Sequence, residues 1–425
     1  MGKQRSFRFS GVAVVAVAVT ALVPALLGGS ADARPTAAPA GVAGHLPVAT
    51  NTRHAGNGVV LGSLISTAAV APVANQSLES SVVATMSPRQ LAGQRVIYSY
   101  SGRTPPASLL SLIRQGDVGG VIFFGANYAN RTQFTAAVKQ LEAANRALTN
   151  PAHPFPLLLM TDQEGGLVRR LPGAPYHSEK WIGSRSTASA RGNQARTAGS
   201  GAAANLLSYG LNVNLAPVLD VYRAPGDFDD QFQRSYSMNP KVVAALGADF
   251  IRAQQRGGVA ATAKHFPGLG AATASQNTDE RPVTIRLSQA VLQGHDEYPY
   301  QAAVSAGVDL VMVSWAKYPR LGSSLPAGLS PAIVKGQLLG RLGFKGVTIT
   351  DAIGAGALAS YGSTQTRALM AAQAGMQLIL ASDSVTQGTQ SMTALRAGYG
   401  DGKLSRADFR ATVTQILALR AHLQP

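Results

Sequence analysis

A Lys-His pair at the start of a glycine-rich loop is the stretch of this sequence whose residue types most suggest chemistry. Lys264 and His265 follow an apolar run at residues 259–263, and a loop with a proline and two glycines then leads to Asp279 and Glu280. The apolar run predicts a buried strand, and the proline and glycines predict a loop. A cation and an imidazole at such a junction suit substrate binding at the C-terminal edge of a parallel α/β barrel.

Acidic residues follow other predicted strands in the same way. Asp162 and Glu164 come after the third apolar run, with Arg170 close behind. Asp220 comes after the fourth run and Asp351 after the seventh. Each residue alone also has a structural interpretation, such as a helix cap or an ion pair, and for Asp351 alone a helix N-cap is the simpler one. Because the C-terminal ends of barrel strands meet at one rim, their coincidence favours an active site.

The elements that must position these residues alternate along the chain. Short apolar runs predict strands that are buried on both faces, and the stretches between them have helical spacing. Eight such units in about 330 residues fit an α/β fold, a single (β/α)8 TIM-barrel-like catalytic domain, with an amphipathic helix from residue 405. An open doubly wound sheet is the alternative, but no G-x-G-x-x-G follows an early strand. The predicted strands are at residues 95–100, 118–124, 156–161, 211–215, 259–264, 310–314, 347–350 and 377–380, and the helices between them include 132–148, 195–209, 240–256, 288–306 and 331–341.

Composition excludes several other kinds of protein. Hydrophobic residues make up 46% of the 425 residues, which is enough for a large core, so the chain is not predicted to be disordered. It contains no cysteine, which rules out disulfides, thiolate nucleophiles and cysteine metal sites. The formal net charge of +16 favours contact with an anionic surface such as a cell wall. Because the basic residues are scattered without interleaved aromatic residues, nucleic acid is not a predicted partner.

The N-terminus predicts export from the cell. Three basic residues precede an uncharged apolar run at residues 10–30, and Ala-Asp-Ala at residues 31–33 places small residues where a signal peptidase cleaves. We therefore predict a signal peptide at residues 1–33, with an uncleaved membrane anchor as the alternative. Residues 34–85 are predicted to be an Ala/Pro-rich linker or leader, and residues 86–425 the folded domain. The protein is thus expected to be secreted, or associated with the cell wall or membrane.

Seven motifs follow one another between Met86 and Leu417. They are M-S-P-R-Q-L-A-G-Q at Met86, V-G-G-V-I-F-F-G at Val118, T-D-Q-E-G-G-L-V-R-R at Thr161, N-L-A-P-V-L-D-V at Asn214, R-S-Y-S at Arg234, K-H-F-P-G at Lys264 and G-V-T-I-T-D at Gly346. In this order they resemble the barrel domain of glycoside hydrolase family 3, and most closely its single-domain β-N-acetylhexosaminidase branch. The combination of D-Q-E-G-G with a downstream K-H-F-P-G is specific to that family.

The resemblance implies a role for each matching position. Asp351 corresponds to the catalytic nucleophile, which forms a covalent glycosyl-enzyme intermediate and makes the enzyme a retaining one. Asp162 corresponds to the acid that holds sugar hydroxyl groups through charge-assisted hydrogen bonds. The chemistry implied needs no metal and no organic cofactor. Four further positions correspond to residues near the bound sugar: Arg170, Arg234, Lys264 and His265.

One motif departs from that branch. Its loop reads roughly K-H-F-P-G-H-G and then D-S-H, whose Asp-His pair is the general acid/base. Here Leu269 replaces the first His, and Ser-Gln-Asn stands at residues 275–277. Neither serine nor asparagine delivers a proton near neutral pH. Asp279 and Glu280 lie in the same loop, and a carboxylic acid with a raised pKa is the usual proton donor of glycosidases. Either could replace the missing pair; the alternative is that both are solvated loop residues.

Two further alternatives stay open at the level of sequence. Trp315, after the sixth predicted strand, could stack on a sugar face or fill the barrel mouth, and we favour stacking. The predicted function is a secreted glycosidase acting on a carbohydrate, either a β-linked glucoside or an N-acetylhexosaminide, in carbohydrate metabolism or cell-wall turnover. The alternative is a carbohydrate-binding pseudo-enzyme that keeps the binding residues but has lost proton transfer. The sequence predicts no oligomeric state.

Overall fold

The computed structural model of the protein describes residues 77–423. The predicted signal peptide, residues 1–33, and residues 34–76 of the predicted linker lie outside the described residues. The last part of that linker forms helix α1 (Leu78–Thr85), which packs against the C-terminal helix α13 (Arg406–Ala421). Within the described residues, no helix is both long and apolar enough to cross a membrane.

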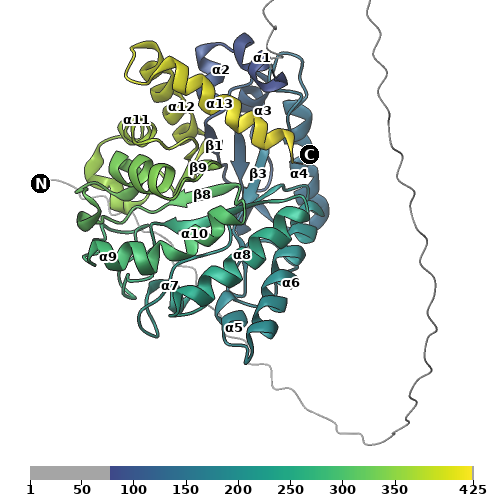
Figure 1. Cartoon of the computed structure of the whole chain (residues 1–425). Helices are drawn as coiled ribbons and strands as arrows, with labels where there is room; N and C mark the ends of the chain where they lie inside the picture. Colours follow the sequence, from purple (N-terminus) through teal and green to yellow (C-terminus); the bar gives the residue numbers. More distant parts are fainter. Residues whose placement is uncertain (1–76, 424–425) are drawn as a thin grey trace, which may run out of the picture. The chain divides into compact units, whose positions relative to one another are not determined.

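Eight parallel strands form the centre of the folded domain (Figure 1). Their order is β10-β1-β2-β3-β6-β7-β8-β9, and a parallel bridge between Ile349 and Leu378 joins the last strand to the start of the first. This ring confirms the predicted (β/α)8 barrel, and every predicted apolar run overlaps one strand. The strands are β1 (Val96–Tyr98), β2 (Gly120–Ile122), β3 (Leu158–Thr161), β6 (Val213–Asn214), β7 (Ala260–Phe266), β8 (Leu310–Val313), β9 (Val347–Thr350) and β10 (Ile379–Leu380).

Helices cover the outside of the barrel (Figure 1). Helix α2 shows why they begin where they do, because Ser87 and Gln90 form a capping box around Pro88 at the first helical position, as the sequence predicts. The segment predicted as one helix at 288–306 is divided into α9 (Gln289–Val291), the π-helix η2 (Leu292–Asp296) and α10 (Tyr298–Ser305). The helix predicted at 331–341 is a π-helix, η5 (Ala332–Arg341). The other helices are α2 (Pro88–Gly93), α3 (Ala107–Arg114), α4 (Arg131–Asn145), α5 (Glu179–Gly183), α6 (Ala188–Leu207), α7 (Phe228–Gln231), α8 (Pro240–Arg256), α11 (Thr364–Ala374) and α12 (Val385–Gly400).

The predicted C-terminal amphipathic helix closes the bottom of the barrel. Ile416 on α13 and Leu423 after it join the apolar cluster inside the strands. Arg420 is fully buried, and its guanidinium donates hydrogen bonds to the carbonyl groups of Phe155 and Pro156, just before β3. These bonds fix α13 across the N-terminal ends of the strands.

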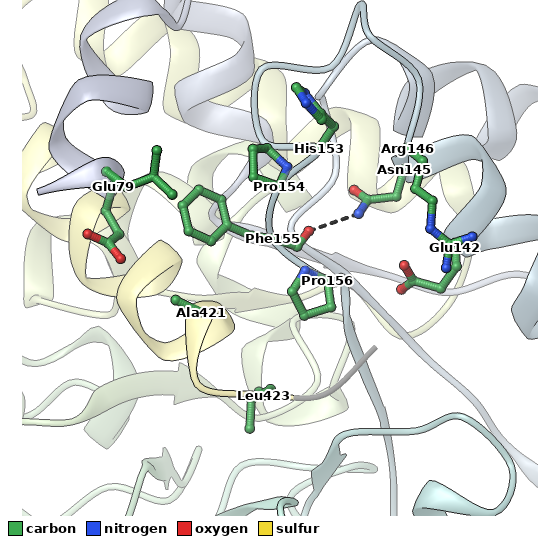
Figure 2. A pocket seen from close by; sticks show the side chains of 11 residues that line it. Glu79, Glu142, Asn145, Arg146, His153, Pro154, Phe155, Pro156, Ala421 and Leu423 are labelled. Atoms are coloured by element: carbon green, nitrogen blue, oxygen red, sulfur yellow. Dashed lines mark hydrogen bonds between the residues drawn. The ribbon is translucent and has the colours of Figure 1, made fainter.

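A pocket of about 370 Å³ lies at this bottom end, between α1, α4 and α13 (Figure 2). Its polar groups are used within the fold: Asn145 Nδ2 donates to Phe155 O at 2.9 Å, and the Glu142 carboxylate accepts from Leu157 N at 3.2 Å. Catalytic groups of such barrels collect at the opposite, C-terminal face of the strands. We therefore assign the bottom pocket a structural role.

Candidate active site

The C-terminal ends of the strands surround a cavity of about 710 Å³. Its floor is made by side chains of the barrel interior, including Ile122, Leu215, Met312 and Leu380. Among the residues predicted from the sequence, Asp162, Arg170, Arg234, Lys264, His265, Asp279 and Asp351 line this cavity, whereas Glu280 and Trp315 do not.

Asp162 and Glu164 reach the same point because they stand two residues apart where β3 passes into a short hairpin, β4 (Gln163–Gly165) and β5 (Val168–Arg169). Residues i and i+2 of an extended chain point the same way. The hairpin needs glycine at Gly165, whose φ is +119° and where a Cβ would lie 2.4 Å from the His177 carbonyl oxygen. The D-Q-E-G-G motif is thus the sequence of a turn that presents two carboxylates together.

Lys264 lies in strand β7 and is almost fully buried between these two carboxylates. Its Nζ is 2.7 Å from Asp162 Oδ1 and 2.7 Å from Glu164 Oε1. Burial lowers the pKa of Lys264, but the two carboxylates outweigh burial and raise the pKa above its usual value. The ammonium group therefore stays charged and holds Asp162 at the cavity wall.

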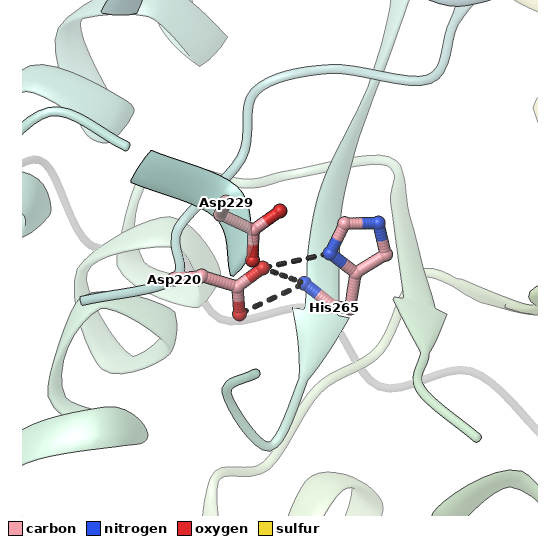
Figure 3. Close-up of side chains that lie close together, drawn as sticks. All are labelled: Asp220, Asp229 and His265. Carbon is pink, nitrogen blue, oxygen red and sulfur yellow. Dashed lines mark hydrogen bonds and ion pairs between the residues drawn. The ribbon is translucent and has the colours of Figure 1, made fainter. Parts of the chain in front are cut away.

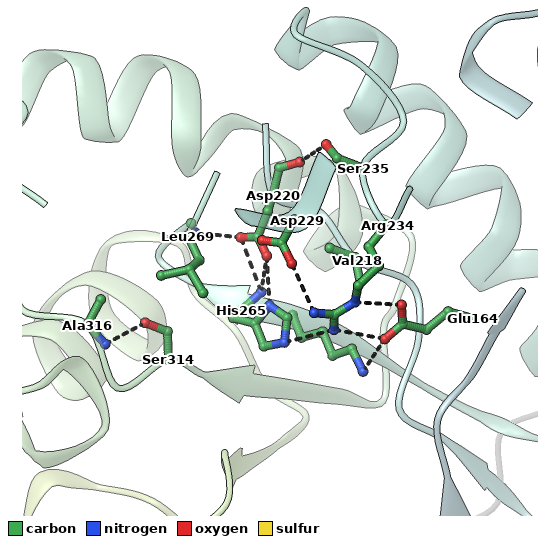
Figure 4. Close-up of polar contacts among 12 residues, drawn as sticks. Glu164, Val218, Asp220, Asp229, Arg234, Ser235, His265, Leu269, Ser314 and Ala316 are labelled. Carbon is green, nitrogen blue, oxygen red and sulfur yellow. Dashed lines mark hydrogen bonds and ion pairs between the residues drawn. The ribbon is translucent and has the colours of Figure 1, made fainter. Parts of the chain in front are cut away.

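Arg234 completes the buried charge network on the other side of Glu164 (Figure 4). Its Nε and Nη2 each lie 2.9 Å from a Glu164 oxygen, and its Nη1 lies 3.0 Å from Asp229 Oδ1. Burial raises the pKa of Glu164, yet Arg234 and Lys264 outweigh it and hold this pKa at about 2. Both oxygens of Glu164 are therefore engaged by cations, which makes Glu164 an internal anchor.

Asp162 differs from Glu164 because it keeps contact with the cavity. Its side chain is 15% exposed, and Arg170 lies above it with Nε 3.7 Å from Oδ2. Burial raises the pKa of Asp162, while Lys264 and Arg170 together lower it below its usual value. An ionised carboxylate at the wall is a strong acceptor for ligand hydroxyl groups.

His265 is oriented by Asp220, which follows β6 (Figure 3). The His265 Nδ1 atom is 2.7 Å from Asp220 Oδ2, and Asp220 also accepts hydrogen bonds from the backbone N–H groups of His265 and Leu269. Burial, followed by the charge of Arg234, lowers the pKa of His265 to about 4. The imidazole is then neutral at physiological pH, with its hydrogen on Nδ1 and an acceptor at Nε2 facing the Arg234 side.

Asp220, Asp229 and His265 bring three possible metal ligands within 4.8 Å of one another (Figure 3). The contacts favour a shared proton over a cation, because N–H donors already occupy both oxygens of Asp220 and the Arg234 guanidinium contacts Asp229. Burial raises the pKa of Asp229 to about 7, with the Asp220 charge adding to it, and raises the pKa of Asp220 to about 6. A protonated Asp229 beside an ionised Asp220 satisfies this geometry.

Asp351 stands at the end of β9 and lines the cavity. Its Oδ1 accepts a hydrogen bond from Ala352 N at 2.7 Å. The next helical segment, η6 (Gly356–Tyr361), begins after Ala355. Asp351 is therefore not a helix N-cap, which was the structural alternative for this residue. Burial raises the pKa of Asp351 and the Asp279 carboxyl adds to this, while His265 opposes it.

The loop after β7 separates the two candidate acids. Asp279 lines the cavity, and backbone hydrogen bonds from Gly356 and Ala357 to the carbonyl groups of Asp279 and Thr278 hold this loop beside the segment after Asp351. Asp279 is exposed at the cavity mouth, but partial desolvation of its carboxyl raises its pKa; the charge of Asp162 adds to this, while Arg234 opposes it. The Glu280 side chain is 59% exposed and pairs with Arg281 outside the cavity. Of the two candidates, the structure brings only Asp279 to the site.

Trp315 corrects one prediction. Its side chain is fully buried, its Nε1 donates to Ala352 O at 2.8 Å, and a Cβ on Gly328 would lie 2.6 Å from its ring. No face of the ring is open to a sugar, so the preferred stacking interpretation is wrong and Trp315 fills the barrel mouth. It packs beneath the segment that carries Asp351.

Sequence reasoning missed the buried acids that hold the cavity together. Glu164 was noted only as a helix cap or a partner for Arg170, and Asp229 was not singled out. Asp229 lies in the insertion between β6 and Arg234, where no strand end marks it. The available signal was the pair Asp229-Asp230 five residues before an arginine that itself needed a buried partner.

Comparison with known proteins places these residues in a wider context. Residues 89–419 match the family model described as the Glycosyl hydrolase family 3 N terminal domain. A protein of Arthroderma benhamiae named "Uncharacterized secreted glycosyl hydrolase" is 45% identical over 334 residues, which are 78% of this chain and 93% of that protein. A "Beta-hexosaminidase" of Stenotrophomonas maltophilia (strain R551-3) is 34% identical over 270 residues, which are 62% of this chain and 76% of that protein.

Two solved structures are similar to this chain as well. A glycoside hydrolase family 3 β-N-acetylglucosaminidase from Paenibacillus sp. str. FPU-7 superposes with a TM-score of 0.73 at 30% identity over 79% of this chain. This chain spans only 62% of the Paenibacillus chain. A β-N-acetylhexosaminidase from Beutenbergia cavernae superposes with a TM-score of 0.70 at 29% identity, over 79% of this chain and 98% of that one.

Proposed function

Because the chain belongs to glycoside hydrolase family 3, and is therefore a glycosidase with a carbohydrate substrate, we propose that it is a retaining β-glycosidase for N-acetylhexosaminides or glucosides. The observation that carries this proposal is the convergence of Asp351 and Asp279 on the cavity that Asp162, Lys264 and His265 line. The names of the Stenotrophomonas and Paenibacillus relatives favour the N-acetylhexosaminide.

In the proposed reaction Asp351 attacks the anomeric carbon while the bond from that carbon to the leaving oxygen breaks. Asp279 gives its proton to the leaving oxygen, which departs as an alcohol. Water then attacks the glycosyl ester, gives a proton back to Asp279, and releases Asp351 as a carboxylate. The raised pKa of Asp279 supports the first step, since the acid must be protonated before it can donate.

The remaining residues bind and orient the sugar in this proposal. The ionised Asp162 accepts hydrogen bonds from sugar hydroxyl groups, and Arg170 at the rim donates to them. His265 lines the cavity beside them, and its ring is oriented by Asp220 at Nδ1 and by Arg234 Nη2, 3.4 Å from Nε2. Lys264 and Arg234 keep these groups in place through Glu164.

A catalytically impaired carbohydrate-binding protein of the same fold is the second candidate. The observation that favours it is the loop itself: Leu269 is buried, and Asn277 lines the cavity where its family branch carries the histidine of the acid/base pair. Such a protein would keep Asp162, Lys264 and His265 for binding. Loss of general acid catalysis lowers rates by about 10²–10⁴-fold, so aryl glycosides, whose leaving groups need little protonation, would still be cleaved slowly.

Hydrolysis of an aryl β-N-acetylglucosaminide and an aryl β-glucoside by wild type and Asp351→Asn tests the proposal. We expect turnover by wild type and a loss of about 10³-fold or more in the variant, since the nucleophile is removed. Azide supplied to Asp351→Gly should restore cleavage and give a glycosyl azide. This rescue would not occur if Asp351 had only a structural role. Equal inertness of wild type and variant, with sugar still bound, would replace the hydrolase proposal by the binding protein.

Export is proposed from the N-terminal sequence, and the name of the Arthroderma relative supports it. The chain then acts outside the cytoplasm, where its net charge of +16 favours anionic wall polymers. Expression of the full chain in a secreting host, followed by N-terminal sequencing of the protein from the medium, should give Arg34 as the first residue. Retention of residues 1–33 on membrane-bound protein would establish the anchor instead.

A further inference from the structure

Two large apolar side chains are exposed at the mouth of the catalytic cavity. Leu167 is 63% exposed and Phe232 is 43% exposed, and both line the cavity. Elsewhere the wall combines charged groups with apolar side chains, and the apolar residues that come from the barrel strands are buried. Apolar surface that is left open beside a binding site indicates a ligand with an apolar face.

The backbone around Phe232 holds the ring in place. Phe228 on α7 lies beneath it as a buried edge-to-face partner, with ring centroids 5.7 Å apart at 78°. The next residue, Gln233, has a φ of +59°, which is rare outside glycine and is maintained by contacts from elsewhere in the chain. Ser178 Oγ donates to the Gln233 side chain at 3.0 Å, and Lys180 N donates to its carbonyl at 3.2 Å.

The same segment is tied to the loop that carries Asp279. Phe228 N donates to Ala272 O at 2.9 Å, and Gln231 Nε2 donates to Ala274 O at 2.9 Å. Phe232 therefore flanks the loop of the proposed proton donor. A general acid protonates the glycosidic oxygen from the leaving-group side, so the groups next to that loop face the leaving group.

We propose that Phe232, with Leu167, forms a binding site for the leaving group, in which the apolar face of a second pyranose ring lies against the phenyl ring. This inference rests on the proposed function, and it assigns the substrate class as an oligosaccharide. Phe232 is a specificity-determining residue with no part in bond cleavage. Stacking on an aromatic ring of this kind strengthens binding by about 3- to 10-fold.

Calorimetric titration of Asp351→Asn, which binds without turnover, tests the site. The probes are N-acetylglucosamine with di-N-acetylchitobiose, and glucose with cellobiose. We expect one disaccharide to bind about 3- to 10-fold more tightly than its monosaccharide, and this gain to disappear when Phe232→Ala is added. Phe232→Trp should keep the gain, which shows that an aromatic face is needed. Leu148→Ala removes an even more exposed apolar side chain that does not line the cavity, and it should leave both affinities unchanged.

The outcomes separate this inference from the proposed function. If a monosaccharide binds but neither disaccharide gains affinity, or the gain survives Phe232→Ala, the leaving-group site is refuted while the glycosidase proposal stands. If no sugar binds and aryl glycosides are not hydrolysed, both are refuted. Thermal unfolding of each variant confirms that lost affinity reflects the binding site rather than loss of the fold.

Discussion

Glu164 and Glu280 belong to the two segments that frame the catalytic cavity, yet their surroundings differ completely. The Glu164 side chain is 2% exposed, and the cations of Arg234 and Lys264 contact it at 2.7–2.9 Å. The Glu280 side chain is 59% exposed and has one partner, Arg281, at 3.2 Å. The inner wall, defined here as Asp162, Glu164, Asp220, Asp229, Arg234, Lys264 and His265, is thus a closed network of charges.

The outer loop, residues 269–280, is built differently. It is held by backbone hydrogen bonds and by α7, and most of its side chains reach solvent. Removal of a cation from the inner wall leaves a buried carboxylate without its partner, whereas a substitution at an exposed residue of the outer loop, such as Glu280, leaves no buried charge unpaired. This difference is consistent with our proposal, in which the inner wall binds the sugar and the loop supplies the proton donor.

The largest expected effect follows a substitution in the outer loop, and it should change activity without changing stability. Asp279→Asn should lower kcat on a substrate with a poor leaving group by about 10²–10⁴-fold, because general acid catalysis is removed. The loss should be much smaller on an aryl glycoside, whose leaving group needs little protonation. Steady-state kinetics on both substrates measure this split.

Glu280→Gln is the matched control, since it changes the neighbouring acid outside the cavity. It should leave kcat within about twofold of wild type. Equal losses in the two variants would mean that loop conformation, and not proton donation, is being measured. Full activity of Asp279→Asn on the poor leaving group would place the proton donor elsewhere.

Removal of a cation from the inner wall should lower the stability of the folded protein. Arg234→Met leaves Asp229 without its cation and Glu164 with Lys264 alone, and it should lower the free energy of unfolding by about 3–5 kcal/mol. Arg281→Met breaks an exposed pair at the end of the outer loop and should change the free energy of unfolding by less than about 1 kcal/mol. Urea denaturation followed by circular dichroism gives both values. Similar losses in the two variants would contradict the distinction between the two regions.

A smaller effect should appear as a pH dependence of the inner wall. Burial raises the pKa of Asp229 to about 7, so in wild type this group contributes stability at low pH that is lost as the pH rises through about 7. Asp229→Asn cannot lose that proton. Between pH 5 and pH 8, the free energy of unfolding of the variant should therefore rise relative to that of wild type by about 1–3 kcal/mol. Denaturant unfolding of both proteins at the two pH values tests this, and a difference that does not change with pH would exclude a proton on Asp229.

Much of the fold was predictable from the sequence because buried parallel strands leave continuous apolar runs. The run at residues 347–350 is strand β9 at the predicted bounds, and the capping residues around Pro88 marked a helix start. The segment at 288–306 was less regular than predicted. Its apolar residues fit one helix, whereas a π-helix divides the segment before Tyr298.

From residue types and spacing alone, the site was predictable mainly where a residue stands at a strand end, whereas Arg170 and Arg234 were matched through the family motifs. Lys264, Asp162 and Asp351 were found at strand ends, since the barrel brings such positions to one rim. Asp229 and Phe232 come from an insertion whose position depends on contacts with residues 178–180 and 272–274, far away in sequence. Trp315 stands at a strand end as well, but burial of a side chain depends on packing that local sequence does not report.

The pairing of α1 with α13 bears on how the protein can be attached to other molecules. Arg410 Nη1 donates to Val83 O at 2.9 Å, so the two helices that begin and end the described chain lie together. Helix α7, whose Phe228 lines the cavity, lies at the other end of the barrel (Figure 1). A fluorescent reporter or a solid support joined at either end of residues 77–423 would therefore leave the entrance of the cavity open to substrate. An immobilised sample should keep the KM that it has in solution.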